Sequence, residues 1–242
     1  MDQNRPPLST YEDLAKMIDH SLLRPELSED QVAEGCRISR EYNVACVMVR
    51  PSDVDLAVRW MEGSGVPVAS VVGFPHGSST TAVKVYETRD LLRRGAREID
   101  MVLNIGKMIS RQFQYVENEV LQIAQACRES GALLKVIFEN AYLGEDLKTI
   151  ACKICNRTEA DFAKTSTGFA PTGYTLEDLK LMRERCKERV QIKAAHGVRT
   201  LDAAIDVYNA GCTRFGATAT AQILDDWKAR LAEREKTVQG AQ

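Results

Sequence analysis

Histidine is scarce in this sequence, and the histidines present form no metal-binding pattern. His20, His76 and His196 are scattered, and none belongs to an HxH or HExxH arrangement. Because catalytic zinc sites usually gather closely spaced histidines, we expect no metal ion and no other cofactor.

Long apolar runs and a bias toward one charge are also lacking. No stretch of about 18 apolar residues could span a bilayer, and the N-terminus, which contains proline and aspartate, lacks the apolar region of a signal peptide. The formal net charge is only −2, so the chain has no general attraction to nucleic acid or to an anionic membrane. We therefore expect a small-molecule partner, with no nucleic acid and no membrane partner.

The cysteines do not predict disulfides. Seven are scattered along the chain, and an odd, irregularly spaced set is typical of reduced thiols in a cytoplasmic protein. Cys152 and Cys155 form a CxxC pair, but they fall within a predicted helix, and no second pair completes a zinc site. We interpret them as thiols of the core or of a helix face, and we predict a cytoplasmic protein.

What the sequence does contain is a repeated alternation of apolar strands and helices. Continuous apolar runs predict strands that are covered on both faces, as in a parallel sheet, and capping signals such as Ser28 with Gln31 predict where helices begin. The predicted strands cover residues 17–23, 44–49, 66–72, 98–103, 133–138, 162–164, 190–193 and 213–216. The predicted helices between and after them cover 28–42, 53–61, 79–94, 115–130, 145–157, 175–188, 200–210 and 219–235.

This pattern predicts an α/β fold with a single domain over residues 1–242. Repeated βα units with buried strands indicate an all-parallel sheet, and eight such units in a chain of this length close most naturally into one (β/α)8 TIM barrel. We expect the polar ends of the chain, residues 1–10 and 236–242, to be frayed.

Polar residues lie at the predicted C-terminal strand ends, where such barrels carry their chemistry. Lys164 and Lys193 each end a short apolar strand and are followed by small residues and glycine. A partly desolvated lysine has a lowered pKa, and its neutral amine can form a Schiff base with a carbonyl substrate. Asp100 interrupts another apolar strand, where a buried carboxylate needs a cationic partner or a function.

These three residues allow two interpretations. In the first, one lysine attacks the substrate, the other keeps it neutral by charge repulsion and anchors Asp100, and Asp100 transfers protons directly or through water. In the second, the three residues form a structural ion-pair network that fills the barrel. The residues alone leave open which lysine would attack.

Glycines follow the last predicted strands, at Gly168, Gly197 and Gly216, and the last helix begins near Ala219. Loops in this position often bind phosphate through backbone N–H groups and a helix N-terminus. Ordinary loop glycines would give the same pattern, so both interpretations stand.

The ordered motifs of the chain resemble those of the deoxyribose-phosphate aldolase family, which are class I, Schiff-base aldolases with a (β/α)8 barrel. The matching segments are residues 18–23, 72–77, 98–102, 134–137, 162–168, 193–200 and 214–217. The resemblance implies that Lys164 is the Schiff-base lysine, Lys193 the second lysine that perturbs its pKa, and Asp100 the proton-relay aspartate. It implies reversible cleavage of 2-deoxy-D-ribose 5-phosphate to acetaldehyde and D-glyceraldehyde 3-phosphate without a metal.

The chain departs from the family pattern where the substrate phosphate would be held. It has His196 before Gly197 where the family usually has two glycines, Thr218 and Ala219 where small serines are usual, and Arg50 where an uncharged residue is common. A related aldolase with a different acceptor aldehyde is therefore the alternative. Arg50 could bind an anion or be an ordinary surface arginine.

The full set of predicted substrate-binding residues follows from these motifs. It comprises Asp19, Arg50, Thr167, Gly168, His196, Gly197, Gly216 and Thr218. The chain also ends at Gln242 without the terminal tyrosine that some relatives direct toward the site. We expect a homodimer, because such barrels often associate through their outer helices.

Overall fold

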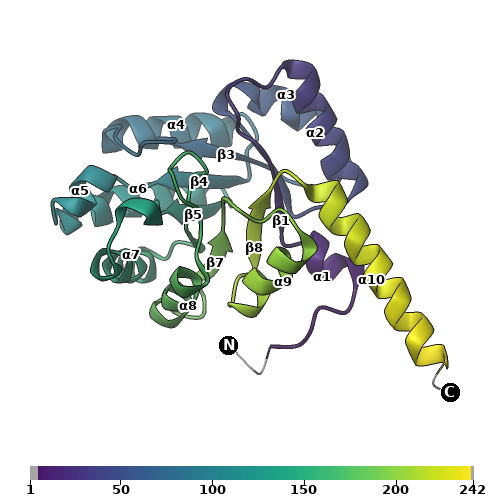
Figure 1. The fold of residues 1–242 in the computed structure, drawn as a ribbon. Helices are drawn as coiled ribbons and strands as arrows, with labels where there is room; N and C mark the ends of the chain where they lie inside the picture. Colours follow the sequence, from purple (N-terminus) through teal and green to yellow (C-terminus); the bar gives the residue numbers. More distant parts are fainter. Residues whose placement is uncertain (1–4, 241–242) are drawn as a thin grey trace.

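The computed structural model describes residues 5–240, and it contains a closed barrel of parallel strands in the order β1 to β8 (Figure 1). The strands are β1 (Ile18–Leu22), β2 (Cys46–Val49), β3 (Val68–Val72), β4 (Glu98–Val102), β5 (Leu133–Ile137), β6 (Phe162–Lys164), β7 (Gln191–Ala194) and β8 (Arg214–Ala217). The predicted (β/α)8 TIM barrel is therefore confirmed. Each predicted strand is present, with ends that differ by up to two residues.

The helices lie around the outside of the barrel (Figure 1). Their bounds are α1 (Tyr11–Ala15), α2 (Glu29–Glu41), α3 (Val54–Met61), α4 (Thr81–Arg93), α5 (Ile105–Ile109), α6 (Phe113–Glu129), α7 (Glu145–Thr158), α8 (Leu176–Arg185), α9 (Leu201–Asn209) and α10 (Thr220–Gly240), with 3-10 turns η1 (Pro51–Asp53) and η2 (Asn140–Tyr142). Ser28 and Gln31 form the predicted capping box at the start of α2. None of the helices within residues 5–240 combines the length and apolar character needed to cross a bilayer.

Sequence reasoning missed the short helix α5. Its N-cap is Asn104, whose side chain accepts a hydrogen bond from the backbone N–H of Lys107. The sequence predicts no element between residues 104 and 114, because a helix of five residues is too short to show an apolar period.

The structure gives contacts or helical structure to the described residues at both ends of the chain. At the N-terminus, Arg5 donates hydrogen bonds to the carbonyls of Tyr208 (2.7 Å) and Cys212 (2.8 Å), and Leu8 is buried. At the C-terminus, α10 continues as a helix to Gly240, since no proline or glycine interrupts it earlier. Residues 1–4 and 241–242 lie outside the described part of the chain.

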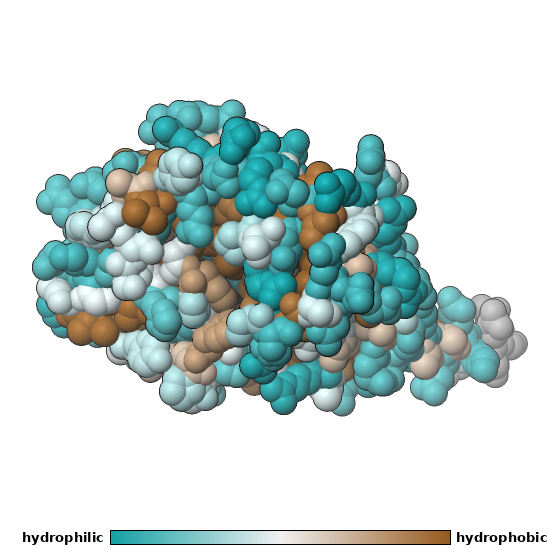
Figure 2. Space-filling model, turned by 90° about the horizontal axis from the view of Figure 1, so that it is seen from above, coloured by the Kyte–Doolittle hydropathy of each residue, from teal (hydrophilic) through white to brown (hydrophobic). Residues whose placement is uncertain are grey.

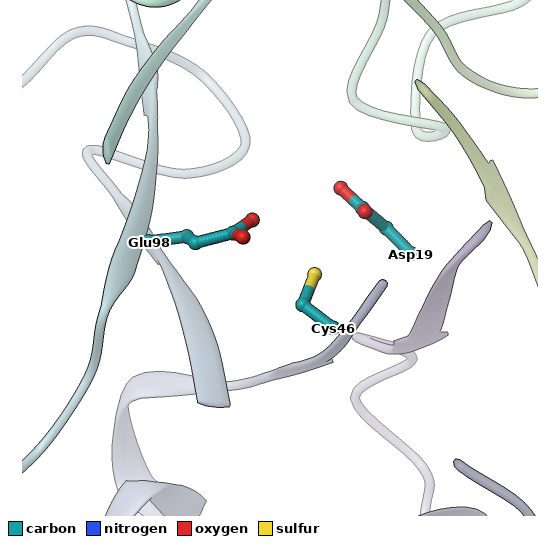
Figure 3. Close-up of side chains that lie close together, drawn as sticks. All are labelled: Asp19, Cys46 and Glu98. Atoms are coloured by element: carbon teal, nitrogen blue, oxygen red, sulfur yellow. The ribbon is translucent and has the colours of Figure 1, made fainter. Parts of the chain in front are cut away.

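Two apolar cores give the barrel its form. The larger one fills the space between the strands and the surrounding helices. The smaller one consists of Cys46 and Met48 of β2 with Ala69 and Val71 of β3. Since side chains alternate along a strand, these residues share one face of β2 and β3, and Cys46 points into the barrel in Figure 3. The interior of the barrel is therefore apolar on this side.

The surface seen from above carries no large apolar face. It is mainly hydrophilic, with small separate hydrophobic patches, and α10 extends away from the barrel (Figure 2). The exposed large apolar side chains in residues 5–240 are also dispersed over several elements, for example Tyr86 on α4, Ile109 on α5 and Phe169 after β6.

Candidate active site

Strand register places the two predicted lysines beside each other. Lys164 is the last residue of β6, and it is aligned with Lys193 of β7, which in turn is aligned with Arg214 of β8. On the other side of β6, β5 is its neighbour, and Lys135 of β5 is aligned with Asp100 of β4. All of these side chains except that of Arg214 are almost completely buried.

The structure brings Lys164, Lys193 and Asp100 into direct contact. Lys164 Nζ lies 2.7 Å from Asp100 Oδ2, and Lys193 Nζ lies 2.8 Å from the same oxygen. One carboxylate oxygen therefore holds both amines, as both sequence interpretations require.

Burial and neighbouring charges shift the pKa values of these groups in opposite directions. Burial lowers the pKa of Lys164 to about 8; Asp100 acts against this shift, and Lys193 adds to it. Burial would also lower the pKa of Lys193, but Asp100 and Asp19 outweigh it and raise that pKa. Lys164 is thus the lysine that can lose its proton near neutral pH, and burial, as predicted for a desolvated lysine, contributes more to this than repulsion by Lys193.

The pKa of Asp100 is lowered, which keeps this residue a carboxylate. Burial alone would raise its pKa, but Lys135, Lys164 and Lys193 together outweigh burial. A carboxylate in contact with the amine can accept a proton from an attacking nucleophile and return it later.

A further set of charged side chains inside the barrel was missed by sequence reasoning. Lys135 Nζ contacts Glu98 Oε2 (2.5 Å) and Asp100 Oδ1 (2.9 Å), and Arg214 bridges Asp19 and Glu98. We call the following seven residues the barrel network: Asp19, Glu98, Asp100, Lys135, Lys164, Lys193 and Arg214. The signal available in the sequence was polar residues within apolar strands, but their partners depend on the register between strands.

Asp19 belongs to this network and not to the wall of the pocket. Its side chain is fully buried and forms ion pairs with Lys193 and Arg214. We had placed Asp19 among the substrate-binding residues because it lies near a strand end. The structure corrects this, because the carboxylate points into the charged interior of the barrel.

Asp19, Cys46 and Glu98 lie close together, as Figure 3 shows, with potential ligand atoms within 4.8 Å of one another. Lys135 and Arg214 already pair with both carboxylates. Burial also raises the pKa of the Cys46 thiol well above its usual value, with a further contribution from Asp19. The two carboxylates are therefore members of the barrel network whose charge is balanced by Lys135 and Arg214, and Cys46 is an uncharged neighbour.

A pocket opens next to Lys164. Its walls come from the loops after β1, β6, β7 and β8. The lining residues that we had predicted are Lys164, Thr167, Gly168, His196, Gly197, Gly216 and Thr218. Sequence reasoning missed two arginines of the same pocket, Arg24 and Arg199. Arginines are frequent at protein surfaces, so nothing in the sequence distinguished these two from the others.

His196 adopts a backbone conformation that favours glycine. Its φ is +65°, in the left-handed region, and the carbonyl packs so closely on Gly173 that a Cβ there would lie 1.7 Å from the His196 oxygen. Nδ1 of His196 is buried and has no hydrogen-bond partner within residues 5–240. The imidazole thus lines the pocket without a hydrogen bond at Nδ1 among the described residues.

Thr167 is held by hydrogen bonds to the carboxylate of Glu139. Its backbone N–H donates to Glu139 Oε1 (3.2 Å), and its hydroxyl donates to the Oε2 atom of the same residue. The hydroxyl also accepts a hydrogen bond from the N–H of Phe169 (3.0 Å). These bonds fix the turn that carries Gly168, whose φ is +96°.

Arg50 does not line the pocket. Its guanidinium pairs with Asp53 (2.6 Å), and it donates hydrogen bonds to backbone carbonyls of the loop after β1. Those carbonyls belong to Arg24 (3.2 Å), Pro25 (2.9 Å) and Leu27 (3.0 Å). The structure therefore replaces the predicted anion contact with another role, since Arg50 anchors the loop that brings Arg24 to the pocket.

The start of α10 is held by a hydrogen bond to β1. Thr218 lines the pocket, and two residues later the Thr220 hydroxyl is hydrogen-bonded to His20 Nδ1 at 2.8 Å. Burial lowers the pKa of His20 to about 4, so its ring is neutral near pH 7. The N-terminus of α10 therefore lies beside the pocket, at the position where helices favour anions.

Comparisons with known proteins agree with this geometry. The model of the DeoC/LacD aldolase family matches residues 14–225. The deoxyribose-phosphate aldolase of Clostridium perfringens (strain 13, type A) is 43% identical over 212 residues, covering 88% of this chain and 94% of the relative.

Solved structures of similar proteins show the same fold. A structure described as "QR15, an Aldolase" has a TM-score of 0.85 and 38% identity, covering 90% of this chain and 97% of the other. A tetrameric deoxyribose phosphate aldolase from Aeropyrum pernix has a TM-score of 0.84 and 29% identity, covering 90% and 92%. The chain belongs to the DeoC/LacD family of aldolases.

Proposed function

We propose that this protein catalyses the reversible cleavage of 2-deoxy-D-ribose 5-phosphate to acetaldehyde and D-glyceraldehyde 3-phosphate through a Schiff base on Lys164. The observation that carries the proposal is the contact between Lys164 Nζ and Asp100 Oδ2, at 2.7 Å, next to a pocket. The deoxyribose-phosphate aldolase named among the relatives supports the choice of substrate.

The first half of the reaction forms the imine. The neutral amine of Lys164 attacks the aldehyde carbon C1 of the open-chain sugar, and a proton moves to the carbonyl oxygen to give a carbinolamine. Loss of water then leaves a protonated imine. Asp100, which contacts Lys164 Nζ, is placed to accept and return these protons.

The second half breaks the carbon–carbon bond. A base removes the proton of the C3 hydroxyl, the C2–C3 bond breaks, and its electron pair moves to the protonated imine to form an enamine. D-Glyceraldehyde 3-phosphate leaves, the enamine takes up a proton at C2, and water hydrolyses the imine to release acetaldehyde. The lysine supplies the electron sink.

The lining of the pocket suits a phosphate group. Arg24 and Arg199 supply positive charge there, and Gly197, Gly216 and the start of α10 offer backbone close to a ligand. Arginine and helix N-termini are common phosphate ligands in proteins.

A trapping experiment tests the proposed lysine. Acetaldehyde and borohydride should leave an N-ethyl group on Lys164, which peptide mass spectrometry would locate, and the Lys164→Leu variant should give no adduct. Modification of Lys193 in place of Lys164 would show that our assignment of the nucleophile is wrong. If the wild type gives no adduct at either lysine, only a role in binding a sugar phosphate would be left.

A second candidate is a related Schiff-base aldolase with a different acceptor aldehyde. The observation that favours it is His196, whose imidazole lies in the part of the pocket assigned to phosphate. For the first candidate, kcat/KM should be larger for deoxyribose 5-phosphate than for unphosphorylated deoxyribose by orders of magnitude. For the second candidate, the two values should be similar, and His196→Gly should improve turnover of the phosphosugar.

Two further statements about the protein belong to this proposal. All seven cysteines are free and buried, which supports a reduced, cytoplasmic protein, and cell fractionation would test it. A homodimer stays our prediction, although one similar protein is described as a tetramer. Light scattering of the purified protein would distinguish these states.

A further inference from the structure

The barrel network contains more cationic groups than carboxylates. Its carboxylates are Asp19, Glu98 and Asp100, and its cationic side chains are Lys135, Lys164, Lys193 and Arg214. Three negative charges therefore face four groups that can carry a positive charge. Because unbalanced charge inside a protein is costly, one of the four is under pressure to be neutral.

The contacts distinguish which of the four that is. Among residues 5–240, Lys135 pairs with three carboxylates, at 2.5 Å, 2.9 Å and 3.4 Å. Lys193 and Arg214 pair with two each. Lys164 pairs with one, and it shares that oxygen with Lys193. Lys164 is thus the cation with the least compensation.

Lys135 is the centre of this arrangement. Its ammonium group occupies Asp100 Oδ1 and Glu98 Oε2, so that only Asp100 Oδ2 is directed toward Lys164. It lies on β5, below the level of Lys164 on β6, because the residue aligned with Lys164 is Ile137. Lys135 is also absent from the pocket lining and has no exposed surface. Its effect on the reaction must therefore pass through other residues.

No other charged side chain from the strands facing Lys164 changes this count. Strand β2 contributes the Cys46 thiol, whose pKa is raised so that it stays uncharged, and β3 contributes apolar Ala69 and Val71. His20 on β1 is engaged by Thr220 and neutral near pH 7. His196 of the loop after β7 lines the same pocket as Lys164 and lies outside the barrel network.

We propose that Lys135 is a positioning residue for the aldolase reaction, because its charge completes the balance of the three buried carboxylates and thereby favours the free amine of Lys164. This inference rests on the proposed Schiff-base role of Lys164. It assigns to Glu98 the opposite effect, since this carboxylate contributes one of the three negative charges that the cations must balance.

The two residues can be tested with a probe that does not depend on the sugar substrate. Acetylacetone condenses with a neutral lysine amine, loses water and gives a stable enaminone that absorbs in the ultraviolet. The rate of its formation, measured against pH, reports the fraction of Lys164 that is a free amine. Lys164→Leu supplies the background rate.

Changes of opposite charge should shift the profile in opposite directions. In Lys135→Met one cation of the barrel network is lost, so the three carboxylates favour the protonated form of Lys164 and its pKa rises. The rate of enaminone formation near pH 7 should therefore fall by at least about tenfold and recover at alkaline pH. With Glu98→Gln, one anion is lost, so the rate near pH 7 should rise, by up to about tenfold. The double variant Lys135→Met/Glu98→Gln should return the profile toward that of the wild type.

A matched control comes from a second buried ion pair outside the barrel. Glu119 of α6 pairs with Lys84 of α4 at 2.9 Å, and both are fully buried. Glu119→Gln removes a buried carboxylate just as Glu98→Gln does, and it should leave the pH profile in place. If Glu119→Gln moved the profile equally, general destabilisation would explain the effect and the proposal would be overturned.

The remaining outcomes are also decisive. If Lys135→Met does not fold, the near-isosteric Glu98→Gln variant decides: a shift to lower pH supports the charge balance, and an unchanged profile overturns it. If the wild type forms no enaminone at Lys164, the proposed function fails. If it does and the variants do not shift, only the role of Lys135 fails.

Discussion

Replacing Lys193 with methionine should make Lys164 much harder to deprotonate. Both ammonium nitrogens contact Asp100 Oδ2, at 2.7 Å and 2.8 Å, so they lie no more than about 5.5 Å apart, and at an effective dielectric constant of about 20 two such charges repel by about 3 kcal/mol. This repulsion favours the free amine of Lys164. Its loss corresponds to a decrease of about 100-fold in the fraction of neutral Lys164.

The pH dependence of the reaction makes this effect measurable. Since the pKa of Lys164 is about 8, about one lysine in ten is neutral at pH 7 in the wild type, and about one in a thousand would be neutral in Lys193→Met. We expect kcat/KM for deoxyribose 5-phosphate to fall by about 100-fold near pH 7, and the difference from the wild type to shrink above about pH 9. Release of glyceraldehyde 3-phosphate, followed by a coupled assay, gives the rates.

The form of the pH profile distinguishes the charge of Lys193 from the space that its side chain fills. A loss of the same size at every pH, with the acidic limb at its wild-type position, would mean that Lys193 acts only by filling space, and our electrostatic reasoning would be refuted. Recovery at alkaline pH cannot come from an unfolded protein. Lys193→Arg keeps the charge, so its acidic limb should lie closer to that of the wild type.

Four other variants test separate parts of the site. Asp100→Asn should still form an imine but lose about 10²- to 10⁴-fold in kcat, because the group that transfers protons is gone; a kcat near that of the wild type would exclude this role. His196→Gly should raise the melting temperature by about 2–4 °C, because glycine relieves a left-handed backbone that costs about 1 kcal/mol, and calorimetry would show it. Arg50→Met should raise KM for the phosphorylated substrate while kcat changes little, since the loop that carries Arg24 loses its anchor; equal effects on unphosphorylated deoxyribose would contradict this. Lys164→Met should be more stable than the wild type by about 3 kcal/mol near pH 7. Because the folded-state pKa of about 8 lies below the ordinary 10.5, the unfolded wild type binds more protons between these values, so wild-type stability rises with pH and the advantage of the variant shrinks there, as urea titrations would show.

The fold was predictable because its signals are local. A buried strand of a parallel sheet is a continuous apolar run, as at Cys46–Val49, and a helix begins at a capping residue such as Ser28. The failures have local causes too. Helix α5 is too short to show a period, and the polar end of α10 lacks the apolar periodicity by which a helix is recognised, although the helix continues to Gly240.

The site was predictable only where a strand end carried an unusual residue. Lys164 and Lys193 were found in this way, because a lysine after an apolar run is conspicuous. Asp19 and Arg50 also lie near strand ends, but sequence position does not indicate which way a side chain turns. One points into the barrel network and the other toward the backbone of a loop.

Lys135 could not be recognised from the sequence for a different reason. Its importance depends on its alignment with Asp100 across two strands, and register is set by the whole sheet. A lysine within an apolar strand shows that some partner must exist, but not which one. The part of the site that depends on contacts between distant strands therefore required the structure.

The sequence leaves open whether the two lysines and Asp100 are catalytic residues or a structural ion-pair network, and in the structure the same residues meet both descriptions. A network that served stability alone would gain from equal numbers of opposite charges, because each uncompensated buried charge costs free energy. The barrel network instead holds Lys164 in excess, at the position that faces the pocket. Removing this lysine would improve the charge balance, so its presence is not explained by stability. A neutral amine next to a carboxylate is, however, what attack on an aldehyde requires, and the lowered pKa of about 8 makes part of Lys164 available in that form near neutral pH.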